Sequence, residues 1–439
     1  MSRRAYVWEL RSAMTSPMAL ACIEIGVIGV IARKAFDAND LLITTIAVTP
    51  AIANACTALW THALTGRNRV HAVTIFQIVI AAAIVTIALL PQGGPWAWAL
   101  IALLLIARFA MTGIYAARTD IWRSNFPRAE RARVTSRITV VISTVISLSA
   151  IAIGITLDRA EHSTLGVGVV FRYIFIACAA VSLVGAWAFS HIRWRHGPNT
   201  MRQEREPASE HDRRVASPLG MYHVLSQDRD FRRYMTAQFV IGVPNLAAIA
   251  PFIIAIDEHM KLGYTSSFVL TSVLTLALPI ISMPLWARLL DRMHVIRFRV
   301  FHSWFFVAAN ALMGIGIITE NYPTLVAARS VLGIAFGGGV LAWNLGHHDF
   351  APKRLARVYM GVHITLTGVR GVFAPFLGTL LYSGAIGLGA ITITVPALGG
   401  WAFIVLAAIS AWGAVLFFQL NRAVTREQQT PPPPTRRPG

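Results

Sequence analysis

Residues 21–30 read ACIEIGVIGV: nine of these ten residues are small or apolar, and the tenth is Glu24. They belong to an apolar segment over 12–32 that is long enough to cross a hydrocarbon core roughly 30 Å thick. Similar segments recur along a chain of 439 residues that is 55% hydrophobic and 13% charged, whereas a soluble domain has about 25% charged residues. Because a backbone in lipid must satisfy its own hydrogen bonds, we predict an all-α polytopic membrane protein.

Twelve transmembrane helices are predicted, numbered here as spans 1 to 12. Their approximate bounds are 12–32, 41–64, 70–91, 95–118, 134–157, 167–191, 235–255, 265–288, 298–319, 323–346, 358–383 and 396–420. One polar connection is much longer than the others and divides the spans into two sets of six. We therefore expect a six-helix bundle over 1–191, a cytoplasmic linker over 192–234, a second bundle over 235–422 and a disordered tail over 423–439.

The basic residues are concentrated on one side of the predicted membrane. Of the 39 lysines and arginines, 31 lie at the N-terminus, in the even-numbered connections or at the C-terminus. By the positive-inside rule, this asymmetry places both termini in the cytoplasm. It also accounts for the net charge of +19 without a nucleic-acid partner, because the cytoplasmic leaflet presents anionic lipids to these residues.

A weak internal repeat relates the two halves of the chain. Trp60 and Trp286 each follow a leucine at the end of spans 2 and 8, and they are 226 residues apart. Arg133 and Arg357 each stand between Ala and Val before spans 5 and 11, and they are 224 residues apart. Because an even number of spans separates the copies, both halves have the same orientation in the membrane, as in transporters built from parallel repeats.

Twelve spans in two six-helix halves joined by a basic linker resemble the major facilitator superfamily, over about residues 5–422. The loop signature of that family, G-x-x-x-D-R-x-G-x-R, is kept after span 8 as Asp291-Arg292, with His294 in place of its last glycine. After span 2 the sequence TGRNR at 65–69 lacks the aspartate. The resemblance implies a central cavity lined by spans 1, 2, 4, 5, 7, 8, 10 and 11.

Ionisable groups near the middle of a span are candidates for function, because each costs roughly 2.5–3.5 kcal/mol to place there. Glu24 is the acid at mid-span, and Arg108 and Arg370 are the mid-span bases. His363 lies seven residues before Arg370, on the same helical face. The three mid-span charges occur in spans 1, 4 and 11, which the resemblance places around the cavity, and spans 3, 9 and 12 carry none.

Glu24 is interpreted as the proton-coupling site, a cation-recognition site, or both. Burial and a nearby arginine act on the proton affinity of a carboxylate in opposite directions, so Glu24 can take up and release a proton as the cavity changes sides. The alternative is a permanent ion pair between Glu24 and Arg108 that joins spans 1 and 4. For Arg370, with His363, the choice lies between contact with an anion or a proton and the capping of carbonyls at a bend in span 11.

The remaining candidates are interpreted as gating residues. They are Asp291, Arg292, Arg329, Asn344 and His347. The run WNLGHHDF at 343–350 contains groups that bind metals, but a polar inner gate is the preferred interpretation. The sequence contains no nucleophile elbow, phosphate-binding loop or HExxH motif, so we expect neither an enzyme nor a cofactor or metal.

Together these observations favour a monomeric secondary transporter in the inner membrane of a bacterium. Its expected partners are a small-molecule substrate, protons and the lipid bilayer, and its favoured function is proton-coupled export of a small compound, with cations as the first class to test. The rival is a symporter or uniporter of an organic anion or a sugar, since two arginines against one acid leave the cavity net positive. A third interpretation is an assembly factor or sensor on the same fold.

Overall fold

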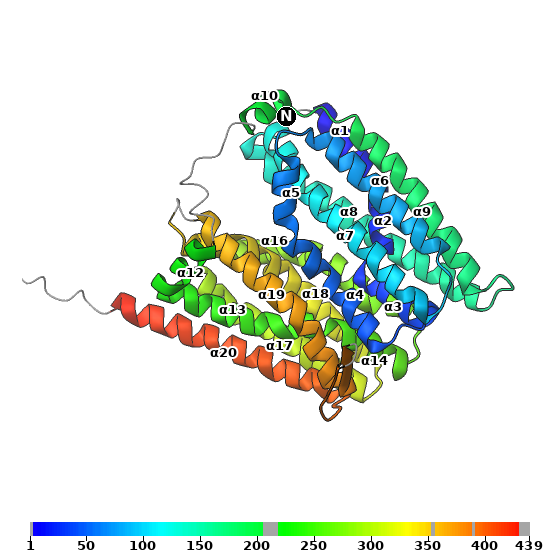
Figure 1. Cartoon of the computed structure of the whole chain (residues 1–439). Helices are drawn as coiled ribbons and strands as arrows, with labels where there is room; N and C mark the ends of the chain where they lie inside the picture. Colours follow the sequence, from blue (N-terminus) through cyan, green and yellow to red (C-terminus); the bar gives the residue numbers. More distant parts are fainter. Residues whose placement is uncertain (1–2, 205–217, 353–355, 389–390, 430–439) are drawn as a thin grey trace, which may run out of the picture.

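A computed structural model describes residues 3–204, 218–352, 356–388 and 391–429 of the chain. Long helices make up almost all of it (Figure 1). The helices of the N-terminal half are α1 (Arg3–Thr15), α2 (Pro17–Cys22), α3 (Ile25–Ala35), α4 (Asp40–Ala55), α5 (Thr57–Leu64), α6 (Arg69–Leu89), α7 (Gly94–Asn125), α8 (Arg128–Glu161) and α9 (Gly166–Ser190). Two short helices of the connection between the halves follow, α10 (Gly197–Glu204) and α12 (Pro218–Gln227).

The C-terminal half repeats this arrangement with more interruptions. Its elements are α13 (Arg229–Ala247), α14 (Ile249–Glu258), α15 (Tyr264–Phe268), the π-helix η1 (Val269–Val273), α16 (Leu274–Leu290), α17 (Val295–Ile318), α18 (Tyr322–Leu345), the 3-10 helix η2 (Gly346–Asp349), α19 (Ala356–Ser383), the strands β1 (Ala385–Leu388) and β2 (Ile391–Thr394), and α20 (Trp401–Gln429). The two strands pair antiparallel, with Ala385 opposite Thr394, and form a small hairpin between spans 11 and 12.

The described residues contain eleven helical segments long and apolar enough to cross a membrane. The remaining span, predicted at 41–64, is broken at Cys56 into α4 and α5. The prediction of an all-α polytopic fold with twelve spans is therefore confirmed, with the hairpin as a small addition. The expected start of a disordered tail at residue 423 is wrong, because α20 continues to Gln429. Within this last part of α20, the Thr425 hydroxyl donates to the Asn421 carbonyl. Residues 430–439 lie outside the described residues.

Several spans are interrupted where they line the space between the halves. Span 1 is divided into α1, α2 and α3, with Pro17 at the start of α2. Span 7 is divided into α13 and α14 after Pro244, which has no backbone N–H to donate within the helix. Span 8 contains the π-helix η1, a form that is frequent at functional sites.

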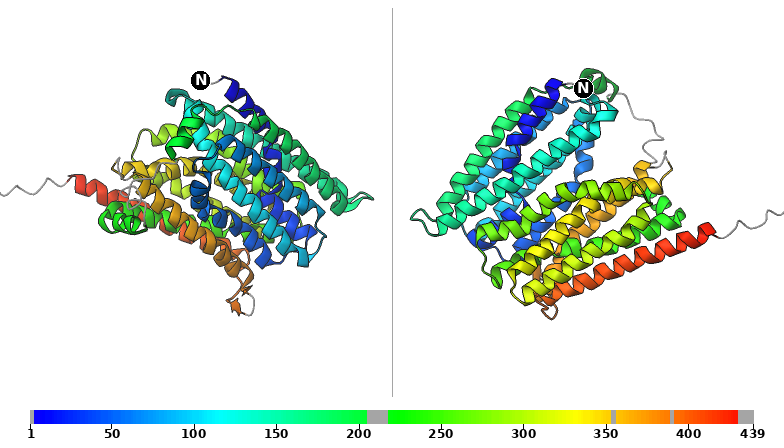
Figure 2. Two further views of the ribbon diagram at one scale, coloured as in Figure 1. Left: turned by 45° about the horizontal axis from the view of Figure 1, so that its top comes forward. Right: turned by 180° about the vertical axis from the view of Figure 1, so that it is seen from behind.

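The two halves meet at one end of the molecule and diverge toward the other (Figures 1 and 2). Near the meeting end α4 packs against α14 and α19, and α3 packs against α14 and α15. We call this contact between the halves the seam. A large apolar cluster continues across it, from Ile31 and Ile43 in the first half to Phe252 and Phe268 in the second. We call the divergent end, which carries α10 and α12, the linker face, and the end with residues 33–40 and 257–264 the closed face.

Candidate functional site

Glu24 lies at a break in span 1. Helix α2 ends at Cys22 and α3 begins at Ile25, so Glu24 has extended backbone angles and stands at the N-cap of α3. Its half-buried side chain makes no capping hydrogen bond. Arg108 Nη2 donates to the Ile23 carbonyl, which the break removes from the helical ladder. The break in span 1 is therefore held from span 4 by Arg108.

No ion pair joins Glu24 to Arg108 among the pairs of described residues. The charge of Glu24 nevertheless acts on Arg108, whose side chain is only 5% exposed. The Arg108 guanidinium donates to a backbone carbonyl and not to the Glu24 carboxylate. This geometry differs from the permanent Glu24–Arg108 ion pair that was the alternative expectation. The Glu24 carboxylate therefore forms no ion pair or side-chain hydrogen bond with any described residue.

The break also contacts the second half. Thr271 Oγ1 in η1 donates to the Gly26 carbonyl at 3.2 Å. A Cβ at Gly26 would lie 2.2 Å from Ser272 Oγ, so only glycine allows this close approach. Glu24 is thus two residues from a tight contact between span 1 and span 8.

Arg329 lies inside the second half and supports η1. Its Nε donates to the Leu270 carbonyl at 2.6 Å, and its Nη2 donates to the Thr271 carbonyl at 3.1 Å. The guanidinium also stacks over the Phe252 ring, with 4.8 Å to the centroid. The structure therefore places this predicted gating residue on the carbonyls of the π-helix whose Thr271 hydroxyl contacts span 1.

Arg370 lines a pocket of about 240 Å³ between spans 7, 9, 10 and 11. Its Nη1 donates to the Gln238 carbonyl on span 7 at 2.7 Å. Gly242, one turn further along α13, leaves the space that the guanidinium fills, since a Cβ there would lie 1.9 Å from Nη1. Arg370 therefore binds a backbone carbonyl, as one of the two interpretations expected, but this carbonyl belongs to span 7 and not to a bend in span 11.

Arg299 is the second arginine of this pocket, and the sequence analysis missed it. Arg299 lies near the start of α17, which begins at Val295, and it is 2% exposed. Its Nη2 donates to Gln238 Oε1 and its Nη1 to His302 Nδ1 at 3.0 Å. His302 Nε2 faces the Ala335 carbonyl at 2.7 Å and so carries the hydrogen. The sequence signal that could have indicated this site is the spacing of Arg299 and His302 by three residues, which places both on one face of a helix.

The pocket has a largely apolar lining into which a few polar groups are set. Besides the two arginines, it is lined by the amides Gln238, Asn245 and Asn344, and none of the described residues that line it is an acid. Arg299 Nε and Arg370 Nε are buried and have no hydrogen-bond partner in the described part of the chain. The cluster thus concentrates positive charge and unused donors in one small space.

His363 is close to this cluster but separate from it. The side chain is 1% exposed, and within the described ranges neither ring nitrogen has a hydrogen-bond partner. Its ring centroid is 5.3 Å from that of Trp343, which lines the pocket. Arg370 and His363 therefore lie on the same side of α19, as their spacing predicts.

The other predicted gating residues lie at the linker face. Asp291 caps the C-terminus of α16, and Arg292 beside it is exposed; neither forms an ion pair with a described residue. Asn344, in the last turn of α18, donates to the Val340 carbonyl at 2.8 Å and lines the pocket. His347 is buried in η2. The structure brings Asn344, but not Asp291 or Arg292, to the arginine pocket.

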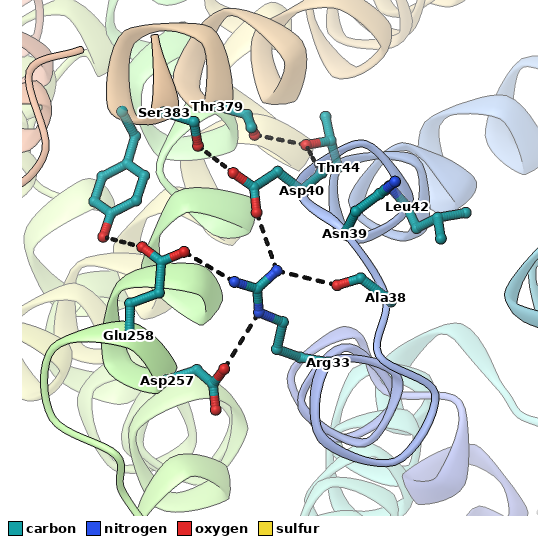
Figure 3. Close-up of polar contacts among 11 residues, drawn as sticks. Arg33, Ala38, Asn39, Asp40, Leu42, Thr44, Asp257, Glu258, Thr379 and Ser383 are labelled. Carbon is teal, nitrogen blue, oxygen red and sulfur yellow. Dashed lines mark hydrogen bonds and ion pairs between the residues drawn. The ribbon is translucent and has the colours of Figure 1, made fainter. Parts of the chain in front are cut away.

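At the closed face, Arg33 joins the two halves (Figure 3). Its guanidinium pairs with Asp40 at 3.1 Å on its own half, and with Asp257 at 3.2 Å and Glu258 at 2.9 Å on the other half. The Ser383 hydroxyl donates to Asp40, which adds a bond across the seam. This cluster is not among the residues predicted from the sequence, because Arg33 and its partners lie at the ends of spans and not in their middle.

Two helical bundles with interrupted spans that meet at one end are typical of membrane transporters built from repeats. The chain matches the family model of the Major Facilitator Superfamily over residues 13–375, and it belongs to that superfamily. Comparison with curated protein sequences gives no match. The superfamily consists of transporters rather than enzymes, and its members act on small molecules.

Solved structures of other transporters share the fold at low sequence identity. A point mutant of the nucleoside transporter NupG superposes with a TM-score of 0.71 at 12% identity, covering 95% of this chain and 99% of NupG. A transporter of the POT family in complex with a thioalcohol-conjugated peptide gives 0.69 at 10% identity, covering 96% of each chain. The xylose transporter XylE from E. coli, in a partially occluded inward-open conformation, gives 0.65 at 10% identity, covering 95% of this chain and 97% of XylE.

Proposed function

We propose that this transporter moves a small organic anion across the membrane by alternating access, with Glu24 as the site of the coupling proton. The observation that carries the proposal is the pocket in the second half. It is lined by Arg299, Arg370 and three amides, and by no acid among the described residues. The sequence analysis favoured a cation, but that reasoning rested on Glu24 without Arg299.

Electrostatics favours an anion in this pocket. Two buried guanidiniums without a counterion repel each other strongly, because the effective dielectric constant of the site is low. A carboxylate or phosphate between them would supply the missing negative charge, and a guanidinium binds such groups through parallel hydrogen bonds. The Nε atoms of Arg299 and Arg370, which have no hydrogen-bond partner among the described residues, would be donors for those bonds.

The size of the pocket limits the substrate to a small molecule. Its volume is about 240 Å³, whereas pockets for drug-sized ligands have roughly 300–1,000 Å³. Trp343, Phe306 and Phe336 give it an apolar wall beside the polar donors. A compact organic anion with one apolar part matches both features.

The conformation supports alternating access with the linker face on the cytoplasmic side. The basic residues of the chain favour this orientation by the positive-inside rule. The Arg33 cluster then closes the periplasmic side, while the exposed Asp291 and Arg292 are free to pair when the linker face closes. We place the protein, as a monomer, in the inner membrane of a bacterium.

Glu24 is suited to carry the proton because it lies at the seam and its carboxylate forms no ion pair or side-chain hydrogen bond with a described residue. Its neighbour Gly26 contacts span 8, so movement of one half against the other changes the surroundings of the carboxylate. Protonation removes the charge that Glu24 places near Arg108. The free carboxylate also supports the second candidate function, export of a cation that binds Glu24 itself.

A thermal-shift screen of the purified protein tests the proposal. Matched panels of small organic anions and cations are added to the wild type and to the Arg370→Gln, Arg299→Gln and Glu24→Gln variants. A ligand that binds the folded state raises its melting temperature. We expect anions to stabilise the wild type and Glu24→Gln but neither arginine variant. Stabilisation by cations alone, lost in Glu24→Gln, would reject the anion proposal in favour of cation export.

A further inference from the structure

A second pocket, of about 830 Å³, opens at the linker face away from the space between the halves. It lies where α6 begins and α9 ends, and the segment from α9 into α10 forms one wall. The residues relevant here are Asn68, His71, Arg193, Trp194, Arg195 and His196. The function proposed above does not use this pocket, and the following inference does not depend on that function.

The pocket carries positive charge that none of the described residues neutralises. The side chains of Arg193 and Arg195 are exposed, and neither forms an ion pair or a side-chain hydrogen bond with any described residue. The backbone N–H of Arg195 donates to Asn125 Oδ1 at 2.9 Å, which fixes the segment against α7. No acid is among the described residues that line the pocket.

Arg69, directly beside the pocket, shows the opposite arrangement. It pairs with Asp120 at 3.0 Å and with Glu204 at 2.7 Å. Its guanidinium lies 5.8 Å from the centroid of the Trp194 ring. Among the described residues, Arg69 thus has counterions, and Arg193 and Arg195 have none.

Trp194 forms a buried floor with an unused donor. The residue is 8% exposed, and a Cβ at Gly197 would lie 2.6 Å from its ring, so glycine makes room for it. The indole Nε1 is buried and has no hydrogen-bond partner among the residues that the structure describes. A buried N–H without an acceptor is uncommon, and an anionic ligand would supply one.

The surface next to the pocket is built for acyl chains. Helices α6 and α9 pack side by side (Figure 1). Their outward faces expose large apolar side chains, including Ile75 (44%), Ile78 (47%), Val184 (54%) and Trp187 (58%). Exposed tryptophan is typical of the membrane interface, so the basic pocket lies at the depth of the headgroups.

We propose that this pocket binds the phosphate-bearing headgroup of an anionic phospholipid, whose acyl chains lie along α6 and α9. Arg193 and Arg195 contact the phosphate from the wall of the pocket, and the imidazoles of His71 and His196 offer further donors. Basic pockets at the ends of transmembrane helices are suited to such headgroups. A soluble phosphate would use the same donors but not the apolar faces of the two helices.

The test measures lipid retained by the full-length protein purified from vesicles of phosphatidylglycerol and phosphatidylcholine. The Arg193→Gln/Arg195→Gln variant is compared with the wild type and with Arg133→Gln/Arg137→Gln. The control removes two exposed arginines from α8 at the same face. We expect the pocket variant to bind phosphatidylglycerol roughly 30-fold more weakly, since each arginine near an anionic lipid contributes about a fivefold factor. The control should bind it as the wild type does.

Two further arms, a lysine variant and competition by phosphate, complete the test. Arg193→Lys/Arg195→Lys, which keeps the charge, should retain most of the binding, so a variant that merely misfolds is recognised. Equal retention of phosphatidylglycerol by the wild type and by Arg193→Gln/Arg195→Gln would overturn the proposal. Release of bound phosphatidylglycerol by millimolar inorganic phosphate would also overturn it, because the site would then prefer a soluble anion.

Discussion

Removal of the Arg33 side chain should open the closed face. In Arg33→Gln, two ion pairs across the seam are lost, those with Asp257 and Glu258, whose side chains are 31% and 42% exposed. Partly exposed pairs contribute about 0.2–1 kcal/mol each. The equilibrium should therefore shift toward the outward-open state by roughly 0.4–2 kcal/mol, which is about 2- to 30-fold.

The shift can be measured as labelling of a single cysteine at Thr379. This side chain is fully buried at the seam, with its hydroxyl 2.6 Å from that of Thr44. In a protein with its three native cysteines replaced by alanine, Thr379→Cys should react with a membrane-impermeant maleimide about 2- to 30-fold faster when Arg33 is glutamine. The increase follows because the thiol is reachable only when the seam opens.

Arg172→Gln is the matched control. Arg172 is an exposed arginine in α9, outside the Arg33 cluster. Its replacement removes the same charge without breaking a contact across the seam, so labelling should stay at the starting rate. If Arg33→Gln and Arg172→Gln label Thr379→Cys equally fast, the Arg33 cluster does not hold the closed face shut.

Three further predictions concern the candidate site. Gly242→Ala should weaken ligand binding at least tenfold in the thermal-shift assay, because its Cβ displaces Arg370, whereas Gly368→Ala, which faces open space, should not. Arg108→Gln should lower the free energy of unfolding by about 1–3 kcal/mol, because the Ile23 carbonyl loses its buried partner; Arg123→Gln, exposed on the same helix, should leave the melting temperature unchanged. Glu24→Gln should abolish uptake driven by a pH gradient while leaving exchange of substrate across the membrane intact; pH-driven uptake at the wild-type rate would remove Glu24 from proton coupling.

Hydropathy was sufficient for the fold because each span is a continuous apolar segment of the length that a bilayer requires. The interruptions within the spans were harder to predict. The break at Glu24 depends on Arg108, 85 residues away from the Ile23 carbonyl that it binds. Such a break is specified by a tertiary contact, and a local pattern cannot reveal it.

The candidate site was predicted in part for the same reason. The cost of a charge in lipid singled out Glu24, Arg108 and Arg370. The structure places Glu24 and Arg108 at the break in span 1 and Arg370 in the pocket of the second half. Arg299 was missed because it stands at the edge of the predicted span 9, and hydropathy does not reveal its burial by neighbouring helices. Arg33 was missed because its partners on the other half are 224 and 225 residues away.

Exchange of a labelled substrate by protein in liposomes tests the central claim most directly. The anion that stabilises the protein best is placed on both sides of the membrane, and uptake of its labelled form is followed. The account predicts uptake by the wild type and by Arg123→Gln, and a fall of about 10- to 150-fold in Arg370→Gln, which loses a charged hydrogen bond to the substrate. Uptake of a cation instead, or anion uptake that Arg370→Gln leaves unchanged, would contradict it.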